Sequence, residues 1–287
     1  MSVPERTPAR WRPSAFLMLS AAVHLAAGIG LLLAPAQWAW WLGALIVNHG
    51  LITAAGLLPR CNWLGPNLTR LPPAAAARGE VALTFDDGPD PAITPQVLDM
   101  LDAAGVRASF FCIGERVAAH AALAREIVRR GHHIENHTQH HPHALSLYGP
   151  QRLAREVLDA QRTLAQASGR APRFVRAVAG LRNPFLEPIL ARHGLQLASW
   201  TRRGYDTRDA AAQVLARLTR GLAAGDILLL HDGHGATTAA GQPVVLAVTY
   251  TLLLAWIKGH GPEPEKALPA TAGAAPGNGQ GTSLPSP

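Results

Sequence analysis

The chain has 287 residues, 48% of them hydrophobic, which is enough apolar material for a large core and excludes wholesale disorder. Its two cysteines, Cys61 and Cys112, are too few to form a disulfide scaffold or a cysteine metal site. The formal net charge is +7, but residues 1–78 hold six Lys/Arg against one acid, whereas residues 79–287 hold twenty against eighteen. No basic block is mixed with aromatics, so we expect no nucleic-acid binding.

Two apolar helices are the first predicted elements. Residues 13–59 contain no Asp, Glu, Lys or Arg, and this stretch is about twice the ~20 residues that cross a bilayer as a helix. Pro35 interrupts it, so the sequence predicts a hairpin of two transmembrane helices over 14–34 and 37–58. The alternative is a cleaved signal peptide, whose apolar run is usually only ~7 to 15 residues. We therefore expect a retained membrane anchor.

The charges beside these spans predict an orientation. Three arginines lie in the N-terminal segment 1–13, three more lie in the predicted linker 59–79, and the turn between the spans has no charge. By the positive-inside rule both ends of the hairpin face the cytoplasm. The sequence thus predicts a multi-pass protein of a bacterial-type inner membrane with a cytoplasmic C-terminal domain. A periplasmic domain is the alternative.

The remaining sequence predicts an α/β domain over residues 80–260. Short β-rich runs alternate with helical patterns, and this order implies a mostly parallel sheet with helices outside it. Six strands favour an incomplete or distorted (β/α) barrel. Residues 261–287 have little to bury and are predicted to be disordered. The expected strands are 81–85, 106–114, 132–136, 173–177, 195–200 and 226–231, and the expected helices are 94–104, 115–130, 150–168, 184–193, 207–223 and 244–257.

Two carboxylates follow the first predicted strand. Asp86 and Asp87 come directly after it and are followed by the turn residues Gly88 and Pro89. Adjacent side chains on an extended chain point to different sides, so one carboxylate can bind a metal while the other faces a water molecule. In such barrels the catalytic groups lie at the carboxyl ends of strands. The same four residues are also ordinary turn composition.

Histidines follow two other predicted strands. His137 and His141 are four residues apart, so if the chain is helical from Thr138 onward their imidazoles share one face and can bind one ion. Alternatively they are part of a solvated His-rich surface. His231 and Asp232 end the sixth strand, where a single histidine can also be a core residue. Acidic and histidine side chains at three strand ends on one rim predict an active site.

Five motifs occur in an order that resembles a known family. They are TFDDGP at 84–89, HTQHH at 137–141, RAVAG at 176–180, SWTRRGYD at 199–206 and LLLHD at 228–232. Together they resemble the polysaccharide deacetylase family, the NodB homology domain of carbohydrate esterases. The resemblance covers about residues 79–260 and implies a metal-dependent hydrolase that removes acyl groups from amino sugars.

The resemblance also implies roles for the residues of the first two motifs. Asp87, His137 and His141 match the ligands of one divalent ion. Zinc is the expected ion, with Co²⁺, Ni²⁺ or Mn²⁺ as alternatives, and coordination positions stay open for water and substrate. Asp86 matches the general base that accepts the proton of the attacking water.

The later motifs imply the remaining roles. Arg176 matches the arginine that orients the base, His231 matches the general acid, and Asp206 matches the acid that supports this histidine. A backbone N–H near Ala179 or Gly180 is expected to help stabilise the oxyanion, and Gly180 is expected to contact the substrate. Trp200 is expected either to form a wall of the substrate groove or to pack in the core.

Departures from the family pattern indicate an altered groove. Val178 and Ala179 stand where the family usually has a proline and an aromatic residue. Arg203 stands where an acid is frequent, and Thr207 stands where a tryptophan is frequent. We expect the substrate subsite to differ from that of a typical member.

Three functions remain open on the sequence. The first is deacetylation of N-acetylated amino sugars in a polysaccharide, an oligosaccharide or a lipid-linked saccharide. The second is deacetylation or deformylation of an undecaprenyl-type lipid-linked sugar at the cytoplasmic face of the membrane. The third, of another class, is a non-catalytic carbohydrate-binding pseudoenzyme. The intact Asp and His residues argue against it.

Overall fold

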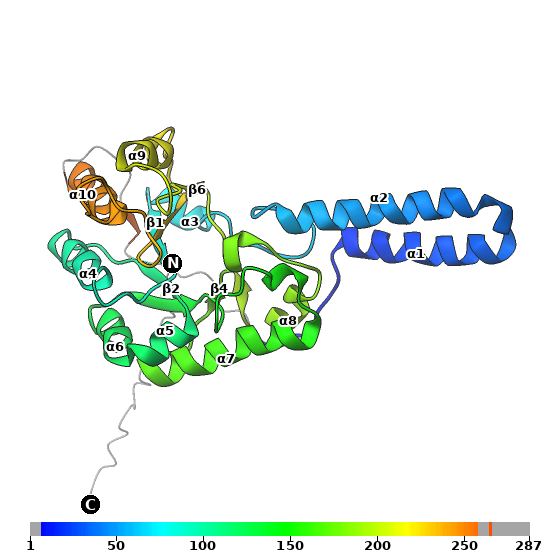
Figure 1. The fold of residues 1–287 in the computed structure, drawn as a ribbon, viewed down its shortest axis with the longest axis horizontal. Coiled ribbons are helices and arrows are strands. Elements are labelled where there is room, and N and C mark those ends of the chain that lie inside the picture. The colour runs from blue at the N-terminus through cyan, green and yellow to red at the C-terminus, as the bar shows by residue number, and fades with distance from the viewer. Residues whose placement is uncertain (1–6, 258–263, 266–287) are drawn as a thin grey trace, which may run out of the picture.

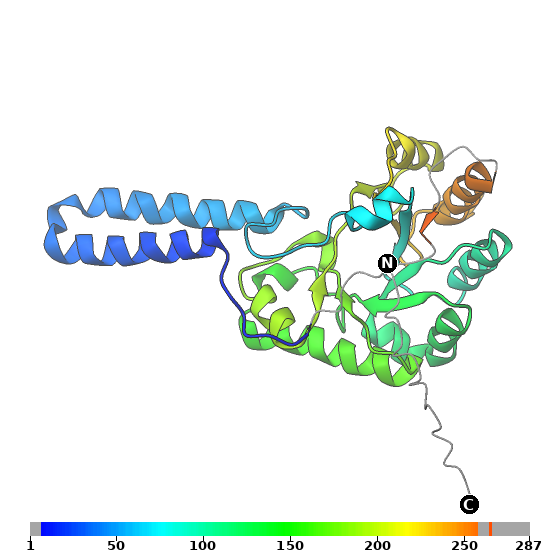
Figure 2. The same ribbon diagram turned by 180° about the vertical axis from the view of Figure 1, so that it is seen from behind.

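The computed structural model describes residues 7–257 and 264–265. It has two parts, a long helical hairpin and an α/β domain, and the hairpin extends from one side of that domain (Figure 1). The view from behind shows the same arrangement, with the outer helices grouped around the sheet (Figure 2).

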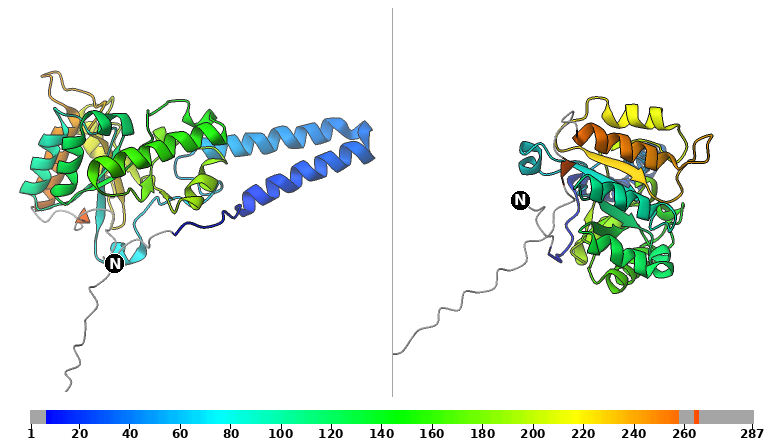
Figure 3. Two further views of the ribbon diagram at one scale, coloured as in Figure 1. Left: turned by 90° about the horizontal axis from the view of Figure 1, so that it is seen from below. Right: turned by 90° about the vertical axis from the view of Figure 1, so that its left-hand side faces the viewer.

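The hairpin consists of helix α1 (Ala15–Leu33) and helix α2 (Trp38–Leu57), joined by a 3-10 turn at Pro35–Gln37. The helices run antiparallel along their length (Figure 3). Both are long and apolar enough to cross a membrane, and because they lie so near the N-terminus the same features also fit a signal sequence. Their large apolar side chains face outward, as Leu32 and Trp40 show with exposures of 83% and 81%.

Polar contacts join the two helices on their facing sides. Asn48 Nδ2 donates to Ser20 Oγ at 2.9 Å in a buried hydrogen bond. The rings of His24 and His49 meet edge to face with centroids 5.1 Å apart. The polar residues of the predicted spans therefore pair with one another.

The segment predicted as a plain linker is partly structured. It contains the short helix α3 (Pro73–Ala77), which begins at a proline in its first turn. Upstream of α3, Leu68 forms a parallel bridge with Ala198, and its N–H donates to the Leu197 carbonyl at 2.9 Å. The segment is thus packed along the α/β domain, which periodicity alone did not indicate.

All strands of the domain are parallel and form one sheet in the order β5-β4-β3-β2-β1-β7-β6, and β8 pairs with the beginning of β1. No pairing joins β5 to β6 in the described part of the chain, so the sheet is an open half-barrel. The strands are β1 (Val81–Asp86), β2 (Ser109–Cys112), β3 (His133–Asn136), β4 (Phe174–Val175), β5 (Gln196–Leu197), β6 (Arg202–Arg203), β7 (Ile227–His231) and β8 (Pro264–Glu265).

This architecture confirms the predicted fold class and adds two strands. The short strand β6 was not predicted, because two arginines have no β-rich pattern. β8 lies within the tail that was predicted to be disordered. The rest of that tail lies outside the described residues.

Helices cover the outside of the sheet (Figure 1). Helix α7 begins at Pro150 and ends at Ser168. It is capped by Gly169, whose φ of 74° is a left-handed conformation that glycine adopts without strain. The predicted helix over 115–130 is two helices, because the backbone turns at His120. The remaining helices are α4 (Thr94–Ala103), α5 (Gly114–Ala119), α6 (Ala121–Arg129), α7 (Pro150–Ser168), α8 (Leu186–Arg192), α9 (Ala211–Thr219) and α10 (Val244–Ile257), with 3-10 turns at Leu145–Leu147 and Val178–Gly180.

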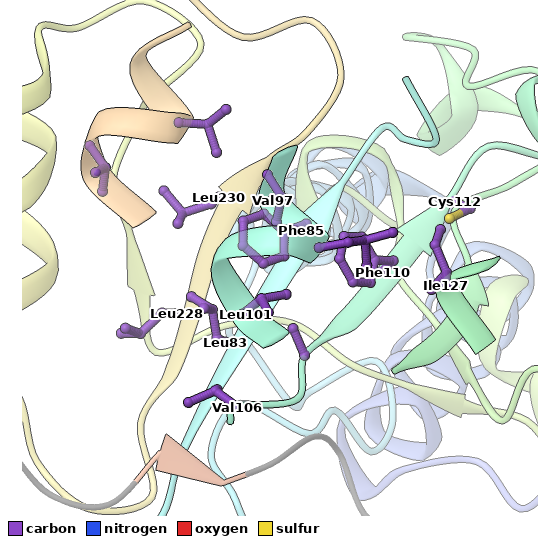
Figure 4. Packing of buried hydrophobic residues seen from close by; sticks show 14 of the residues in the cluster. Leu83, Phe85, Val97, Leu101, Val106, Phe110, Cys112, Ile127, Leu228 and Leu230 are labelled. Carbon is purple, nitrogen blue, oxygen red and sulfur yellow. The ribbon is translucent and has the colours of Figure 1, made fainter. Parts of the chain in front are cut away.

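The main core lies between the central strands and these helices. Phe85 of β1 and Phe110 of β2 stack with ring centroids 5.1 Å apart, and Leu228 and Leu230 of β7 pack beside them (Figure 4). All six residues of β1 are buried. Because β1 is central and buried, the position of the two aspartates at its end is fixed by the core.

Candidate active site

The carboxyl ends of β1, β3 and β7 meet at one cleft with a volume of about 420 Å³. The cleft combines carboxylates, imidazoles and a few apolar side chains, which is the composition of a small-molecule site. Its lining residues are Asp86, Asp87, His137, His141, His143, Val178, Ala179, Trp200, Arg203, Thr207, Leu229, His231 and His234.

Asp87, His137 and His141 form an Asp–His–His cluster suited to a metal ion. One ligand atom of each residue lies within 4.8 Å of the other two. Oδ1 of Asp87 is 3.3 Å from Nε2 of His137 and 3.1 Å from Nε2 of His141. This oxygen is buried and accepts no hydrogen bond of good geometry. One carboxylate and two imidazoles around an orphaned oxygen fit a divalent ion such as zinc.

The electrostatics of the cluster agree with a cation site. Burial alone would raise the pKa of Asp87, but the neighbouring imidazoles of His137, His141 and His234 hold it well below its usual range. Burial would lower the pKa of His137, yet the charges of Asp86 and Asp87 raise it. The carboxylate is therefore ionised, and protons compete with a metal for the imidazole.

The two histidines come together by a loop and not by a helix. The segment after β3 is irregular, and Thr138 and His141 have φ values of 67° and 51°. Asp87 also has a left-handed φ of 73°. The helical condition considered for this pair is therefore not met, but the two histidines do come together. Non-glycine residues in this conformation cost about 1–2 kcal/mol each, so the surrounding packing holds the cluster in shape.

Asp86 is held by the buried arginine of the third motif. Nη1 of Arg176 donates to Oδ1 of Asp86 at 2.6 Å and to Oγ1 of Thr84 at 2.9 Å. Arg176 is fully buried, and burial lowers its pKa although Asp86 acts to raise it. Further hydrogen bonds to the carbonyls of Ala198 and Ser199 fix the guanidinium. This ion pair keeps one face of Asp86 occupied and leaves Oδ2 toward the cluster, 3.8 Å from Nε2 of His137.

His231 and Asp206 form the second buried pair. Nδ1 of His231 is 2.8 Å from Oδ1 of Asp206, and the His231 N–H donates to Oδ2 at 2.7 Å. Burial lowers the pKa of His231, but the hydrogen bond and charge of Asp206 outweigh it, so the pKa is raised. Because Nδ1 is engaged, Nε2 is the ring nitrogen available to a substrate. The sequence placed Asp206 beside His231 only by resemblance, and the structure brings the two together.

Gly180 does not line the cleft. Its N–H donates to the Ala177 carbonyl at 2.8 Å, so it is not free to stabilise an oxyanion. Its φ is 75°, and a side chain there would come within 2.6 Å of Pro59 and 2.7 Å of Trp200. The expected contact of Gly180 with substrate is therefore replaced by a packing role. Val178 and Ala179 line the cleft at this point instead.

Trp200 has both of the roles considered for it. It lines the cleft and is only 5% exposed. It also belongs to a core cluster with Phe111 and Leu229. One edge of the ring is thus available to a ligand, while the rest is fixed by packing.

The structure adds histidines that the motifs did not identify. His234 lies three residues after His231, and its Nδ1 is 3.4 Å from Oδ2 of Asp87. Its Nε2 is 2.9 Å from Nη2 of Arg116. His143 also lines the cleft and meets His141 edge to face at 5.7 Å. The only signal in the sequence was their closeness to the motif histidines.

Asp232 supports the turn after β1. Its carboxylate is fully buried and accepts a 2.6 Å hydrogen bond from Oγ1 of Thr94. Burial raises the pKa of Asp232 to about 7. A side chain at Gly88 would come within 2.3 Å of this carboxylate, which explains the glycine after the two aspartates.

Comparison with known proteins first establishes the class of the chain. Residues 74–198 match the family model described as polysaccharide deacetylase. The chain is 41% identical to a curated relative and covers 71% of its length. The protein therefore belongs to the polysaccharide deacetylase family and is a deacetylase that hydrolyses C–N bonds. This confirms the resemblance read from the five motifs.

The individual relatives are named as deacetylases of chitooligosaccharide or of peptidoglycan N-acetylglucosamine. The first is the chitooligosaccharide deacetylase of Bradyrhizobium sp. (strain ANU 289), matched over 159 residues, or 54% of this chain. The peptidoglycan-N-acetylglucosamine deacetylase of Bacillus cereus is 35% identical over 157 residues, which are 53% of this chain and 72% of that one. A crystal structure of the Bc1960 peptidoglycan N-acetylglucosamine deacetylase with a bound hydroxamate is 25% identical, with a TM-score of 0.62 over 71% of this chain and 91% of that one.

Proposed function

We propose that the protein removes acetyl groups from N-acetylated amino sugars by hydrolysis at the cleft formed by β1, β3 and β7. The observation that carries this proposal is the meeting of two buried acid–base pairs with an Asp–His–His cluster on one rim. The relatives named above act on chitooligosaccharide and peptidoglycan, which supports an N-acetylglucosamine saccharide as the substrate class.

In the proposed reaction Asp86 is the general base. Its Oδ2 lies toward the cluster, and the ion pair of Oδ1 with Arg176 keeps the carboxylate oriented. It accepts a proton from water as the water oxygen forms a bond to the acyl carbon. A divalent ion held by Asp87, His137 and His141 would polarise the acyl carbonyl and make the water more acidic.

His231 is the proposed general acid. The C–N bond breaks as protonated Nε2 of His231 donates its proton to the leaving nitrogen. Acetate and a free amino sugar result, so the water supplies the new carboxylate oxygen. Asp206 holds Nδ1 and therefore fixes the tautomer and the direction of this donor. Trp200 and Ala179 add apolar surface to the lining of the cleft.

The test is acetate release from an N-acetylglucosamine oligomer by the full chain in detergent with added Zn²⁺ or Co²⁺. The Asp86→Asn variant is the control, since it is nearly isosteric and removes only the base. We expect release by the parent alone. No release from either protein with any saccharide tested would support the binding-protein alternative.

The second candidate is a lipid-linked sugar as the substrate, and the attachment of the hairpin favours it. The chain just after α2 comes close to the wall of the cleft. A side chain at Gly180 would come within 2.6 Å of Pro59 and 2.7 Å of the cleft-lining Trp200, so Pro59 packs against Gly180 beside this tryptophan. The carbonyl of Pro59 also accepts a 2.8 Å hydrogen bond from Oγ of Ser199. If the hairpin spans a membrane, this contact keeps the cleft close to the bilayer surface. Acyl-group release from the lipid-linked sugar in vesicles tests this candidate.

We further propose that the hairpin is a two-span anchor with both ends in the cytoplasm. The arginines on its flanks and the charge-free turn support this orientation. A reporter enzyme that is active only in the periplasm, fused after Gly79, should be inactive. An active reporter would place the catalytic domain in the periplasm, where polymer substrates are found.

A further inference from the structure

Among the residues that the structure describes, one arginine that lines the cleft has no anionic partner. Arg203 lies on β6 and lines the cleft. Its guanidinium carbon is 5.4 Å from the centroid of the Trp200 ring and 4.9 Å from that of Tyr205. Nε of Arg203 is buried and has no hydrogen-bond partner, and in the described part of the chain no carboxylate lies within ion-pair distance of it. The guanidinium is held by aromatic rings and not by an acid.

Neighbouring arginines differ from Arg203 in this respect. Arg202 makes an ion pair with Asp226 at 2.5 Å, and Arg217 pairs with Asp209 at the same distance. Arg176 pairs with Asp86. A guanidinium whose donors are unused in a partly enclosed cleft favours an oxyanion from outside the protein, because its planar fork matches carboxylate and phosphate geometry.

The position of Arg203 indicates which part of a substrate it contacts. Arg203 pairs in register with Leu229 of β7, two residues before the proposed general acid His231. The general acid faces the leaving nitrogen, so this side of the cleft receives the amino sugar and not the acyl group. A second cation lies near this segment. Nη1 of Arg60, which follows the C-terminal end of α2, donates to the carbonyl of Thr201 at 3.1 Å, two residues before Arg203.

We propose that Arg203 determines substrate specificity by binding an oxyanion attached to the amino sugar. The inference deepens the deacetylase function proposed above and rests on it. The oxyanion has two possible sources, a phosphate that joins the sugar to a lipid carrier or a carboxylate of an acidic saccharide. In either case the enzyme prefers an anionic N-acetylated saccharide to a neutral one.

Kinetics on three matched substrates test the proposal. They are a neutral N-acetylglucosamine oligomer, the same oligomer with a phosphate ester at its reducing end, and the same oligomer with a carboxylate there. We expect Arg203→Gln to raise the KM for the preferred anionic substrate about 10- to 100-fold relative to the neutral one, the usual effect of losing a charge-assisted hydrogen bond. Arg203→Lys should restore part of the preference. The anionic substrate whose KM rises more in Arg203→Gln shows whether the bound oxyanion is a phosphate or a carboxylate.

The matched control is Arg208→Gln. Arg208 contacts the same Tyr205 ring at 4.4 Å, but it is exposed, lies 3.7 Å from Asp209 and does not line the cleft. We expect this variant to keep the ratio of kcat/KM values of the parent. If Arg203→Gln lowered kcat/KM equally for the neutral and the anionic substrates, the proposal would be overturned.

Binding separates this inference from the proposed function. The Kd of the phosphorylated and carboxylated oligomers is measured by calorimetry on Asp86→Asn, with and without Arg203→Gln. Weaker binding of an anion in the double variant supports the oxyanion site even if no substrate is deacetylated. Equal binding by both proteins would refute the site even if the enzyme is active.

Discussion

At the scale of single residues, each proposed proton carrier is held by a partner from another strand. Asp86 ends β1 and is fixed by Arg176, which follows β4. His231 ends β7 and is fixed by Asp206, which follows β6. The Asp–His–His cluster is a third group, and His137 contacts Arg176 only through its backbone, because Nδ1 of His137 donates to the Arg176 carbonyl at 2.9 Å. The proposed base, acid and metal site can therefore be tested separately by substitution.

The first prediction concerns this separation. Asp87→Ala and His137→Ala should lose both the bound metal and activity, because each removes one of three ligands. Asp86→Asn should keep the metal and lose about 10²- to 10⁴-fold in kcat, the usual contribution of a general base. Metal content by mass spectrometry and acetate release measure the two effects. Equal metal loss in all three variants would contradict the division of roles.

The second prediction concerns pH. Burial lowers the pKa of His231, but Asp206 raises it above the ordinary value, so the proton of the general acid is retained to higher pH. Activity should fall as the pH rises through this raised pKa. In Asp206→Asn the pKa of His231 drops, and the alkaline limb of the pH–kcat profile should move to lower pH. Asp209→Asn, on an acid that pairs with Arg217, should leave that limb in place.

At the scale of elements, the C-terminal end of α2 is hydrogen-bonded to the α/β domain. The Arg182 N–H donates to the Gly56 carbonyl at 3.0 Å. Nη2 of Arg182 also donates to the Gly65 carbonyl at 3.2 Å. The close approach requires a glycine, because a Cβ at position 56 would lie 2.3 Å from the Arg182 carbonyl oxygen. The hairpin is thus a packed part of the molecule at its base.

The third prediction tests this contact. Gly56→Ala should lower the free energy of unfolding by about 1–3 kcal/mol, the usual cost of overpacking. Gly50→Ala is the matched control, since it lies in the same helix with no atom within 4 Å of its added Cβ. Denaturant unfolding in detergent micelles compares the two variants. If both variants lost the same free energy of unfolding, the contact at Gly56 would contribute nothing specific to stability.

At the scale of the whole molecule, the sheet order brings distant residues to one rim. β1 lies between β2 and β7, so the ends of the first and the seventh strand are neighbours. The Asp–His–His cluster joins Asp87, after β1, to a loop that follows β3. An ion bound there would connect parts of the chain that are separate in the unfolded state.

The fourth prediction follows from this link. Metal that binds only the folded protein stabilises it by mass action, by about 2.7 kcal/mol when its concentration is 100 times the Kd. Added Zn²⁺ should therefore raise the Tm of the metal-free protein with increasing concentration, and a chelator should reverse the rise. His137→Ala should show no such rise, whereas a substitution at exposed His140 should behave as the parent does.

The sequence by itself determined the apolar hairpin, the parallel α/β domain and the residues of the cluster. Period and composition are local properties, so a run such as residues 81–85 is recognisable before folding. The five motifs identified the family for the same reason, since each motif is a short run of consecutive residues. Whether the chain is helical after Thr138 was left open by the sequence, because φ values in an irregular loop leave no periodic pattern.

Only the tertiary structure decided which side chains face one another. The orphaned oxygen of Asp87, the unpaired guanidinium of Arg203 and the engaged N–H of Gly180 are all set by contacts between distant segments. The packing of Pro59 on the cleft wall is another such contact. Burial and pairing depend on the positions of strands far apart in the chain, so local sequence does not encode them.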